Sequence, residues 1–455
     1  MKSPSPIRPI SPARIAAFDI LLRVARENAY ASELLHSARY SSLSPADHRL
    51  ATEITMGVMR WRSRLDDEIS KLSAEPFHKL DPEVRESLRI AAYQLLYLDR
   101  IPASAAINES VELVKRARKK SAAAFVNAVL RKLTKRDEGP ARAETTNNSA
   151  ALSRRFAHPN WLVDRWIAQF GGEATARICA HNQQPPATAI RLRDSAVEQE
   201  LRDAGVTLSP GALLSSARIV GSGDITRTAA FRQGRVVIQD EASQLVAALV
   251  GYGSQILDCC CAPGGKTSIL ADRNPSSLVL AVELHPHRAR LTRKLVGQSN
   301  VRVISADTRR LPISARFDRI LVDVPCSGTG TLARNPEIKW RVKPDDLADL
   351  QSRQLAILNS AMQQVAPGGR LVYSSCSLEH EENADVVERA LAQSGDFRVV
   401  DIRGELETLC SAGDVVWPDV PRLVDGPYLR TLPGIHPCDG FFAAIIEHQE
   451  SVVSG

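Results

Sequence analysis

Two cysteine-containing segments have the residue types and spacing that covalent chemistry would need. Cys326 lies in DVPCSGTG, which begins at Asp323, and Cys376 lies in YSSCS. A thiol with an ordinary pKa of about 8.5 is only slightly ionised at neutral pH, so a nucleophilic cysteine needs help from its surroundings. Free cysteines are usually small buried fillers, which is the alternative for each residue taken alone. Because both cysteines follow predicted strands, the pair favours a chemical role.

One reaction that needs such a thiol is substitution at carbon 5 of a pyrimidine. Carbon 5 is a poor nucleophile until a cysteine thiolate adds to carbon 6, which turns carbon 5 into an enamine carbon able to attack a sulfonium methyl group. A carboxyl group at the N3 edge of the base stabilises that adduct, and Asp323 is available for this task. An Asp/Asn-Pro-Pro-aromatic segment here would instead indicate methylation of an exocyclic amine, but this chain has a thiol.

A glycine turn earlier in the chain is expected to hold a cofactor. Residues 255–270, QILDCCCAPGGKTSIL, predict a short strand, a turn and a helix that begins near Lys266. Free N–H groups at such a helix start, and the close approach that glycine allows, form a cradle for a ligand. A P-loop would need glycine where this chain has Cys260, and the G-x-G-x-x-G fingerprint is absent. The turn therefore favours a nucleoside without a bound phosphate chain, and S-adenosylmethionine is the expected cofactor.

Strands and helices alternate from Gly234 onward, as in a Rossmann-like doubly wound α/β domain. Parallel strands are expected at residues 256–261, 278–282, 301–305, 319–322 and 370–374. Ligands of such sheets bind at the carboxyl ends of the strands. Glu283 is thus placed to bind ribose hydroxyls, and Asp307 to bind the adenine amino group. The alternative for each carboxylate is a helix cap or a solvated surface position.

Composition narrows the class of protein. The formal net charge of +6 is weak evidence for an anionic partner, and the aromatic content of 5% is too low for base stacking to dominate recognition. No apolar run has the length of a signal peptide or a membrane span, so we expect a cytoplasmic protein without a membrane partner. The cysteines lack C-x-x-C spacing, so neither a disulfide framework nor a zinc ribbon is expected. The run of residues 259–261 is expected to pack around the turn and not to bind metal.

Residues 1–140 predict a separate all-helical domain. Apolar residues recur at helical spacing from Ser11, a helix opens at Asp81-Pro82, and two further helices lie between residues 107 and 133. Residues 113–136 carry many Lys and Arg and no acidic residue. A solvated helix face is the ordinary interpretation, whereas a one-sign block with nothing to neutralise it indicates phosphate contacts. Both interpretations remain open on the residues alone.

Two segments of this domain favour the interpretation that the basic residues contact phosphates. They are LRIAAYQLLYLDRIPASAAINESVELVK at residues 88–115 and SAAAFVNAVLRKL at residues 121–133. Together they resemble the NusB family of helical RNA-binding proteins. The resemblance implies that the basic segment contacts RNA.

The middle of the chain predicts a linker and a small module. Residues 137–153 are polar and small, which is typical of a linker. Residues 150–234 predict a small α/β module with a strand near 188–193. The Rossmann-like catalytic domain is then expected at residues 235–449.

Three segments of the catalytic domain are specific in combination. They are DCCCAPGGKT, DVPCSGTGTLARNPEIKW and YSSCSLEHEEN, and DGFFAA at residues 439–444 matches a last core strand. Together they resemble the RNA cytosine-C5 methyltransferases of the NOL1/NOP2/Sun family, which use S-adenosylmethionine. With a NusB-like domain in front, the architecture resembles the bacterial members that act on small-subunit ribosomal RNA.

The resemblance also assigns roles to residues. It implies that Cys376 is the nucleophile and that Cys326 assists breakdown of the adduct, whereas DNA cytosine methyltransferases use the thiol of the Pro-Cys pair. It implies that Lys266 and Asp323 also touch the target base. The cofactor-binding residues that it implies are Cys260, Cys261, Ala262, Pro263, Gly264, Gly265, Lys266, Glu283, Asp307 and Asp323. The chain departs from the family pattern at Ser375, where Thr is common, at Glu283, where Asp is frequent, and at one of the three adjacent cysteines, where Ala is usual.

We therefore expect an enzyme that methylates C5 of a cytosine in small-subunit ribosomal RNA, as a monomer and without a metal ion. A transfer RNA cytosine-C5 methyltransferase of the same family is one alternative, because no residue excludes it. A non-catalytic RNA-binding assembly factor is the other, and the intact pair of Cys326 and Cys376 argues against it.

Overall fold

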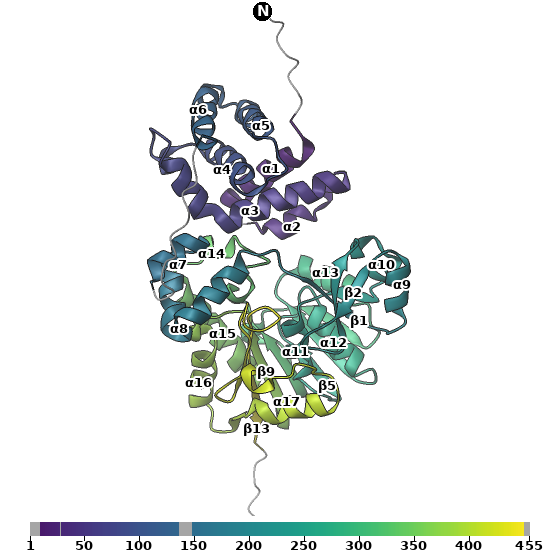
Figure 1. Ribbon diagram of the computed structural model, residues 1–455. Helices are drawn as coiled ribbons and strands as arrows, with labels where there is room; N and C mark the ends of the chain where they lie inside the picture. The colour runs from purple at the N-terminus through teal and green to yellow at the C-terminus, as the bar shows by residue number, and fades with distance from the viewer. Residues whose placement is uncertain (1–9, 28, 136–147, 450–455) are drawn as a thin grey trace, which may run out of the picture. The chain divides into compact units, whose positions relative to one another are not determined.

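The computed structural model describes residues 10–27, 29–135 and 148–449 (Figure 1). Helix α7 (Ser149–Phe156) occupies the described end of the predicted linker, and the rest of that linker lies outside the described residues. Asn148 caps this helix, because its side chain accepts a hydrogen bond from the N–H of Ala151. The linker prediction is therefore wrong from residue 149 onward.

The chain divides into two compact units. One comprises Met1–Pro185 with Leu332–Arg341, and the other comprises Pro186–Thr331 with Val342–Gly455. In the described parts of both units, no helix has the length and apolar character needed to cross a membrane. The domain boundaries expected from the sequence stay a prediction: residues 1–140, 150–234 and 235–449.

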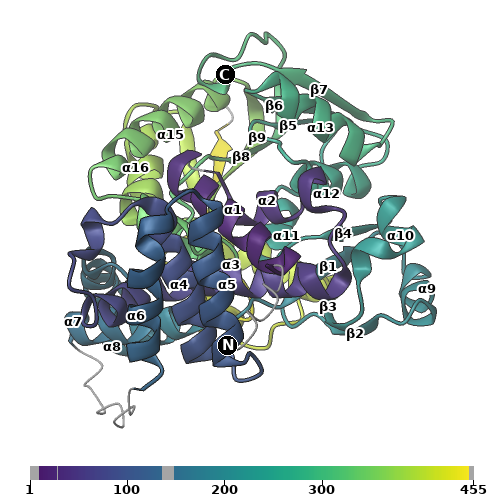
Figure 2. The same ribbon diagram turned by 90° about the horizontal axis from the view of Figure 1, so that it is seen from above.

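The first unit contains helices and no strand in its described part. The helices are α1 (Pro12–Glu27), α2 (Ala31–Leu35), α3 (Pro45–Ser70), α4 (Pro82–Tyr97), α5 (Ala103–Arg116), α6 (Ala123–Leu133), α7, α8 (Asn160–Asn182) and α14 (Ile338–Arg341). Helix α4 begins at Pro82 as predicted, because a proline in the first turn lacks only an N–H that would have no partner there. Figure 2 shows helices α1 to α6 grouped together. They share one core, which includes the fully buried Ile20, Ile54 and Leu88. The all-helical prediction for this part of the chain is confirmed.

Residues 332–341, which follow the DVPCSGTG motif in the sequence, belong to this helical unit. Trp340 Nε1 donates a hydrogen bond to the carbonyl oxygen of Met59 at 2.6 Å. Lys339 is buried, and its Nζ donates to the carbonyl oxygen of Arg60 at 2.9 Å. Burial lowers the pKa of Lys339 well below its ordinary value. Helix α3 therefore anchors the chain just beyond this motif.

The second unit begins with a small antiparallel sheet in the order β2-β3-β1-β4. Its elements are β1 (Thr188–Leu192), α9 (Val197–Asp203), β2 (Thr207–Pro210), β3 (Ala217–Ser222), α10 (Ala229–Arg232) and β4 (Val236–Ile238). Strand β1 lies where the sequence predicts one. Strand β4 pairs with β1, so the small sheet extends beyond residue 234. Ile190, Leu201 and Val236 form part of its core.

The larger sheet has the strand order β11-β12-β13-β9-β8-β5-β6-β7, with β10 paired to β13. Its strands are β5 (Gln255–Asp258), β6 (Leu278–Glu283), β7 (Val301–Ser305), β8 (Phe317–Asp323), β9 (Val365–Ser375), β10 (Phe397–Val400), β11 (Val424–Asp425), β12 (Tyr428–Arg430) and β13 (Phe442–His448). Strands β5 to β9 are parallel, and β13 runs antiparallel to β9. The doubly wound prediction is confirmed, and the sequence did not predict β10, β11 or β12.

Helices cover both faces of the parallel strands (Figure 1). They are α11 (Glu241–Ala248), α12 (Gly265–Arg273), α13 (Pro286–Val296), α15 (Asp346–Met362), α16 (Ala384–Ala392) and α17 (Ile402–Ser411). Side chains of β8 alternate between the faces: Leu321 joins the core beneath α11, α12 and α17, and Val322 joins the core beneath α15 and α16. Because both faces are covered, these strands are largely apolar and chemistry-bearing residues come at their carboxyl ends.

Candidate active site

The turn between β5 and α12 has a backbone that requires glycine. Gly264 has a φ of +112°, and a Cβ there would lie only 2.5 Å from Cγ2 of Val296 in α13. Helix α12 begins at Gly265, one residue before the predicted start. The free N–H groups of its first turn therefore lie at the carboxyl edge of the sheet, next to the end of β5.

The three adjacent cysteines have different surroundings. Cys259 is buried in the core beneath α15, Cys261 packs against Ala281 and Ala289, and Cys260 is partly exposed. Burial raises the pKa of all three thiols. Among the residues that the structure describes, no group of three or more His, Cys, Asp or Glu side chains could hold a metal ion. These surroundings support the packing interpretation of the triplet.

Asp258 ends β5 and was not among the expected site residues. It is buried, and Thr267 Oγ1 donates a hydrogen bond to its Oδ2 at 2.6 Å. Its Oδ1 has no hydrogen-bond partner within the described residues. Burial raises the pKa of Asp258 to about 6. A buried carboxyl group thus lies directly beneath the glycine turn.

Glu283 and Asp307 lie at the carboxyl ends of two neighbouring parallel strands, β6 and β7. Glu283 ends β6 and is buried, and its Oε1 accepts a hydrogen bond from the N–H of His285 at 2.9 Å. Asp307 follows β7 and accepts a hydrogen bond from the N–H of Arg309 at 3.0 Å. The Arg309 guanidinium also forms an ion pair with the Asp307 carboxylate at 2.7 Å. The hydrogen bond from Arg309 lowers the pKa of Asp307. Asp307 therefore acts as a cap in this structure, and its contact with adenine stays a prediction.

Lys266 and Asp323 form an ion pair at the same edge. Lys266 Nζ lies 2.8 Å from Asp323 Oδ2, and Ser374 Oγ donates to Asp323 Oδ1 at 2.8 Å. Lys266 Nζ also lies 5.1 Å from the ring centroid of Phe441. Burial opposes the charge of Lys266, but the neighbouring Asp323 carboxylate outweighs it and the pKa of Lys266 is raised. Lys266 therefore keeps its positive charge, and donors hold both oxygens of the Asp323 side chain.

The two cysteines singled out from the sequence meet in space. Cys326 follows β8 and Cys376 follows β9, and these strands are parallel neighbours. Both thiols are free and partly exposed, and their Sγ atoms lie 3.2 Å apart. The hydrogen bond with Cys376, and then burial, raise the pKa of Cys326 well above its ordinary value. The Cys326 thiol therefore holds its proton more strongly than a free cysteine does, and either sulfur can be the donor in the contact between the two.

Polar contacts hold the segment that follows β9. The N–H of Gly330 donates to the carbonyl oxygen of Cys376 at 2.9 Å, and Ser375 Oγ donates to Asn383 Oδ1 at 2.5 Å. Sequence reasoning gave no role to Asn383, or to Glu382 beside it. Both residues lie in the motif YSSCSLEHEEN, but this segment contains several glutamates, and the sequence alone does not distinguish Glu382 from the others.

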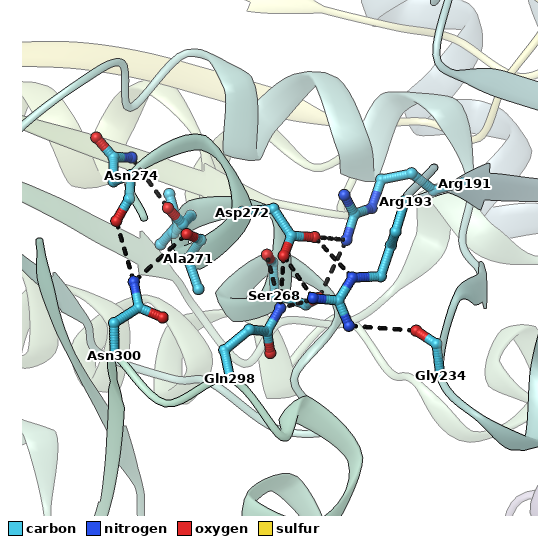
Figure 3. A network of polar contacts seen from close by, with 10 residues as sticks. Arg191, Arg193, Gly234, Ser268, Ala271, Asp272, Asn274, Gln298 and Asn300 are labelled. Carbon is cyan, nitrogen blue, oxygen red and sulfur yellow. Dashed lines mark hydrogen bonds and ion pairs between the residues drawn. The ribbon is translucent and has the colours of Figure 1, made fainter. Parts of the chain in front are cut away.

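The far end of α12 is tied to the small sheet (Figure 3). Arg191 of β1 donates to Asp272 Oδ2 at 2.7 Å and to Ser268 Oγ at 3.0 Å. Arg193 lies 2.6 Å from Asp272 Oδ1, and Gln298 Nε2 donates to the same oxygen at 2.9 Å. One carboxylate therefore fixes the helix whose first turn forms the glycine cradle.

The basic segment of the helical unit lies around the C-terminal ends of α5 and α6. Exposed members are Lys115, Arg116, Arg118, Lys120, Arg131, Lys132 and Lys135. Lys115 pairs with Glu112 at 2.7 Å, and Lys119 pairs with Asp81 at 2.7 Å. The expectation that nothing neutralises the segment is therefore wrong for these two lysines, because Glu112 lies one turn before Lys115 on α5 and Asp81 lies beside Lys119.

Solved structures share this fold. The crystal structure of the protein PH0851 has a TM-score of 0.78 at 23% identity and covers 97% of this chain and 99% of its own. The structure of NSun6 from Pyrococcus horikoshii has a TM-score of 0.55 at 17% identity and covers 64% of this chain and 99% of its own. At these identities the likeness concerns the fold alone.

Comparisons of the sequence identify the family of this chain. Residues 250–447 match the family 16S rRNA methyltransferase RsmB/F, residues 11–135 match the NusB family, and residues 158–223 match a ferredoxin-like domain of RsmF/B-like methyltransferases. The probable ribosomal RNA small subunit methyltransferase B of Bacillus subtilis is 35% identical over 94% of this chain and 97% of its own length. The ribosomal RNA small subunit methyltransferase B of Vibrio cholerae is 31% identical over 96% of this chain and 97% of its own length. The chain belongs to the RsmB/F family of 16S ribosomal RNA methyltransferases.

Proposed function

We propose that this chain methylates carbon 5 of a cytosine in small-subunit ribosomal RNA, with S-adenosylmethionine as the methyl donor and Cys376 as the nucleophile. One observation carries the proposal: the sulfur atoms of Cys326 and Cys376 lie 3.2 Å apart at the sheet edge that also holds the Lys266–Asp323 pair. Methylation of an amine needs no thiol, because its lone pair attacks the methyl group directly. A pyrimidine carbon needs prior addition of a nucleophile to the ring.

The carboxyl edge of the sheet fits the cofactor. When bound, S-adenosylmethionine supplies an electrophilic methyl group on a sulfonium. The glycine turn offers free N–H groups, and the buried Glu283 carboxylate at the end of β6 can accept hydrogen bonds from ribose hydroxyls. We assign the cofactor contacts to residues 260–266, Glu283, Asp307 and Asp323.

The reaction proceeds through a bond between enzyme and base. Cys376 reacts as its thiolate and gives a sulfur electron pair to C6, and the Lys266–Asp323 pair supplies a proton at N3. Carbon 5 of the adduct would then form a bond to the methyl group that bound S-adenosylmethionine would supply, and the methyl–sulfur bond would break with its electron pair left on the sulfur. Loss of the C5 proton to a base reforms the C5–C6 double bond and expels the Cys376 thiolate, while N3 returns its proton. Cys326 assists this last stage.

Release of tritium from small-subunit ribosomal RNA labelled with [5-³H]cytidine tests the proposal. Methylation at C5 replaces the C5 hydrogen, so tritium must enter the water in step with methyl transfer. Methyl transfer without tritium release would contradict the C5 assignment.

Transfer RNA labelled in the same way serves as the parallel substrate. We expect methyl transfer to the ribosomal RNA and not to transfer RNA. Methylation of transfer RNA alone would move the assignment to the transfer RNA enzyme of the same chemistry. Binding of RNA and cofactor without any methyl transfer would favour the assembly factor.

A further inference from the structure

Glu382 is a buried carboxylate that the reaction scheme above does not use. It ends the short helix η7 (His380–Glu382), and its exposed fraction is 0%. A buried carboxylate is costly unless several donors surround it. The donors around Glu382 therefore show which parts of the fold depend on it.

The carboxylate of Glu382 accepts hydrogen bonds from both cysteine segments. Ser327, directly after Cys326, donates its N–H to Oε1 at 2.8 Å and its Oγ to Oε2 at 2.5 Å. Ser377, directly after Cys376, donates its Oγ to the same Oε2 at 2.5 Å. The two serine Oγ atoms also lie 3.0 Å apart. A single carboxylate thus joins the residues that follow the two thiols.

Contacts with α15 and β9 fix the position of Glu382 itself. Gln354 of α15 donates its Nε2 to Glu382 Oε1 at 2.8 Å and to the carbonyl oxygen of Pro325 at 3.0 Å. Tyr373 of β9 donates its hydroxyl to the carbonyl oxygen of Glu382 at 2.6 Å. Donors from α15 and from the segments that follow β8 and β9 surround the carboxyl group, which is the pattern expected of a side chain held in one position.

We propose that Glu382 is a positioning residue, which holds Cys326 and Cys376 at the distance and orientation that the covalent reaction requires. The inference rests on the function proposed above, since it concerns the two thiols of that reaction. It assigns no contact between Glu382 and the substrate. Displacement of a reacting group by about 1 Å can reduce a rate on the order of 100-fold, so loss of the hydrogen bonds to Glu382 should lower kcat.

The charge of Glu382 also acts on Cys326. The hydrogen bond with Cys376 and burial are the main causes of the raised pKa of Cys326, and the charges of Cys376, Glu382 and Asp323 add to them. The charge of Cys326 also acts on the titratable hydroxyl of Tyr373. Neutral glutamine at position 382 should therefore lower the pKa of Cys326, whereas a role in packing alone would leave it unchanged.

Steady-state methylation is the first measurement. Glu382→Gln keeps the size of the side chain and one acceptor oxygen but removes the charge. We expect kcat to fall on the order of 100-fold, with little change in the KM for RNA and for the cofactor. Glu388→Gln, an exposed glutamate on α16, is the matched control and should keep the wild-type kcat.

Alkylation of Cys326 as a function of pH is the second measurement. It is made in Cys376→Ala, with iodoacetamide and mass spectrometry of the Cys326 peptide. The midpoint of alkylation should move to lower pH when Glu382→Gln is added and should stay in place with Glu382→Asp, which keeps the charge. Ser377→Ala removes one donor and keeps the charge, so it should reduce kcat without moving the midpoint, and it serves if Glu382→Gln does not fold.

Trapping of the RNA adduct separates failure of this inference from failure of the proposed function. Cys326→Ala should accumulate the adduct, and addition of Glu382→Gln should slow its formation. No adduct in Cys326→Ala would overturn the proposed function. An adduct that forms equally fast in both, together with a wild-type kcat and an unmoved midpoint in Glu382→Gln, would overturn only the role of Glu382.

Discussion

Nζ of Lys266 lies 2.8 Å from Oδ2 of Asp323, so the first turn of α12 and the end of β8 meet in one ion pair. Ser374 at the end of β9 holds the second oxygen of the same carboxylate. Three adjacent elements of the fold are thus linked at the edge where Cys326 and Cys376 lie. The pair is suited to move a proton at a bound base, because it is partly buried and has fixed geometry.

Replacement of either member of this pair should remove catalysis and retain the fold. We expect kcat for methylation to fall roughly 10²- to 10⁴-fold in Lys266→Met and in Asp323→Asn, the usual range for positioned proton-transfer groups. Lys343→Met, an exposed lysine of the same compact unit, should keep the wild-type kcat. Normal rates in both pair variants would exclude proton transfer by Lys266 and Asp323.

Asp258 should make stability depend on pH in a defined window. Its pKa is raised to about 6 in the folded chain, against about 3.9 for an unfolded aspartate. The carboxyl group is neutral in both states below pH ~4, and folding must work against its ionisation as the pH rises through ~6. The melting temperature of Asp258→Asn should therefore rise relative to that of the wild type between pH ~4 and ~6, by an amount that corresponds to roughly 2–3 kcal/mol. Above pH ~6 the difference between the two proteins should stay constant. A difference that is constant over the whole pH range would show that Asp258 ionises normally.

The glycine turn predicts a sharp contrast between two substitutions. Gly264→Ala would place a methyl group 2.5 Å from Val296 and would strain a φ of +112°. We expect the affinity for S-adenosylmethionine, measured by calorimetry, to fall roughly tenfold or more, which corresponds to about 1.4 kcal/mol. Gly297→Ala is the control, because Gly297 also has a positive φ, of +67°, but nothing lies within 4 Å of the added methyl group. Equal losses in the two variants would mean that backbone strain, not packing on α13, sets the requirement.

Charge removal from the basic segment of the helical unit should weaken RNA binding. The triple change Arg131→Gln, Lys132→Gln and Lys135→Gln removes exposed cations at the end of α6. If these cations contact phosphates, the slope of log K against log salt should fall by about 2, since each phosphate contact contributes roughly 0.7–0.9. The matched triple Arg398→Gln, Arg403→Gln and Arg422→Gln changes exposed cations of the other unit and should leave the slope unchanged. An unchanged slope in the first triple would favour the solvated-face interpretation.

The parallel part of the catalytic sheet could be predicted because its physics leaves a clear pattern. Strands covered on both faces are continuous apolar runs that end at polar residues, and the predicted strand at 301–305 coincides with β7. Strands β11 and β12 contain only two and three residues, so their sequences are too short to show the alternation of apolar and polar residues that predicts a strand. The helix α7 was missed because its capping residue Asn148 lies in a stretch of small polar residues that resembles a linker.

The site was predictable only where residue type and strand position coincide. The proximity of Cys326, Cys376 and Asp323 could be predicted because the ends of parallel neighbouring strands must lie side by side, and their roles stay a prediction. Glu382 and Ser374 were missed because their importance depends on which donors and acceptors meet in three dimensions. The same is true of Lys339, whose burial in the helical unit leaves no sign in a charged surface-type sequence.

Covalent trapping of RNA tests the central claim most directly. Cys326→Ala, Cys376→Ala and the double variant would each be incubated with small-subunit ribosomal RNA and S-adenosylmethionine, and the protein examined on a denaturing gel. If Cys376 is the nucleophile and Cys326 is needed for breakdown of the adduct, a retarded protein–RNA band persists in Cys326→Ala and is absent from the other two. A band only in Cys376→Ala would reverse the two roles, and no band in any variant that still binds RNA and cofactor would contradict the covalent mechanism.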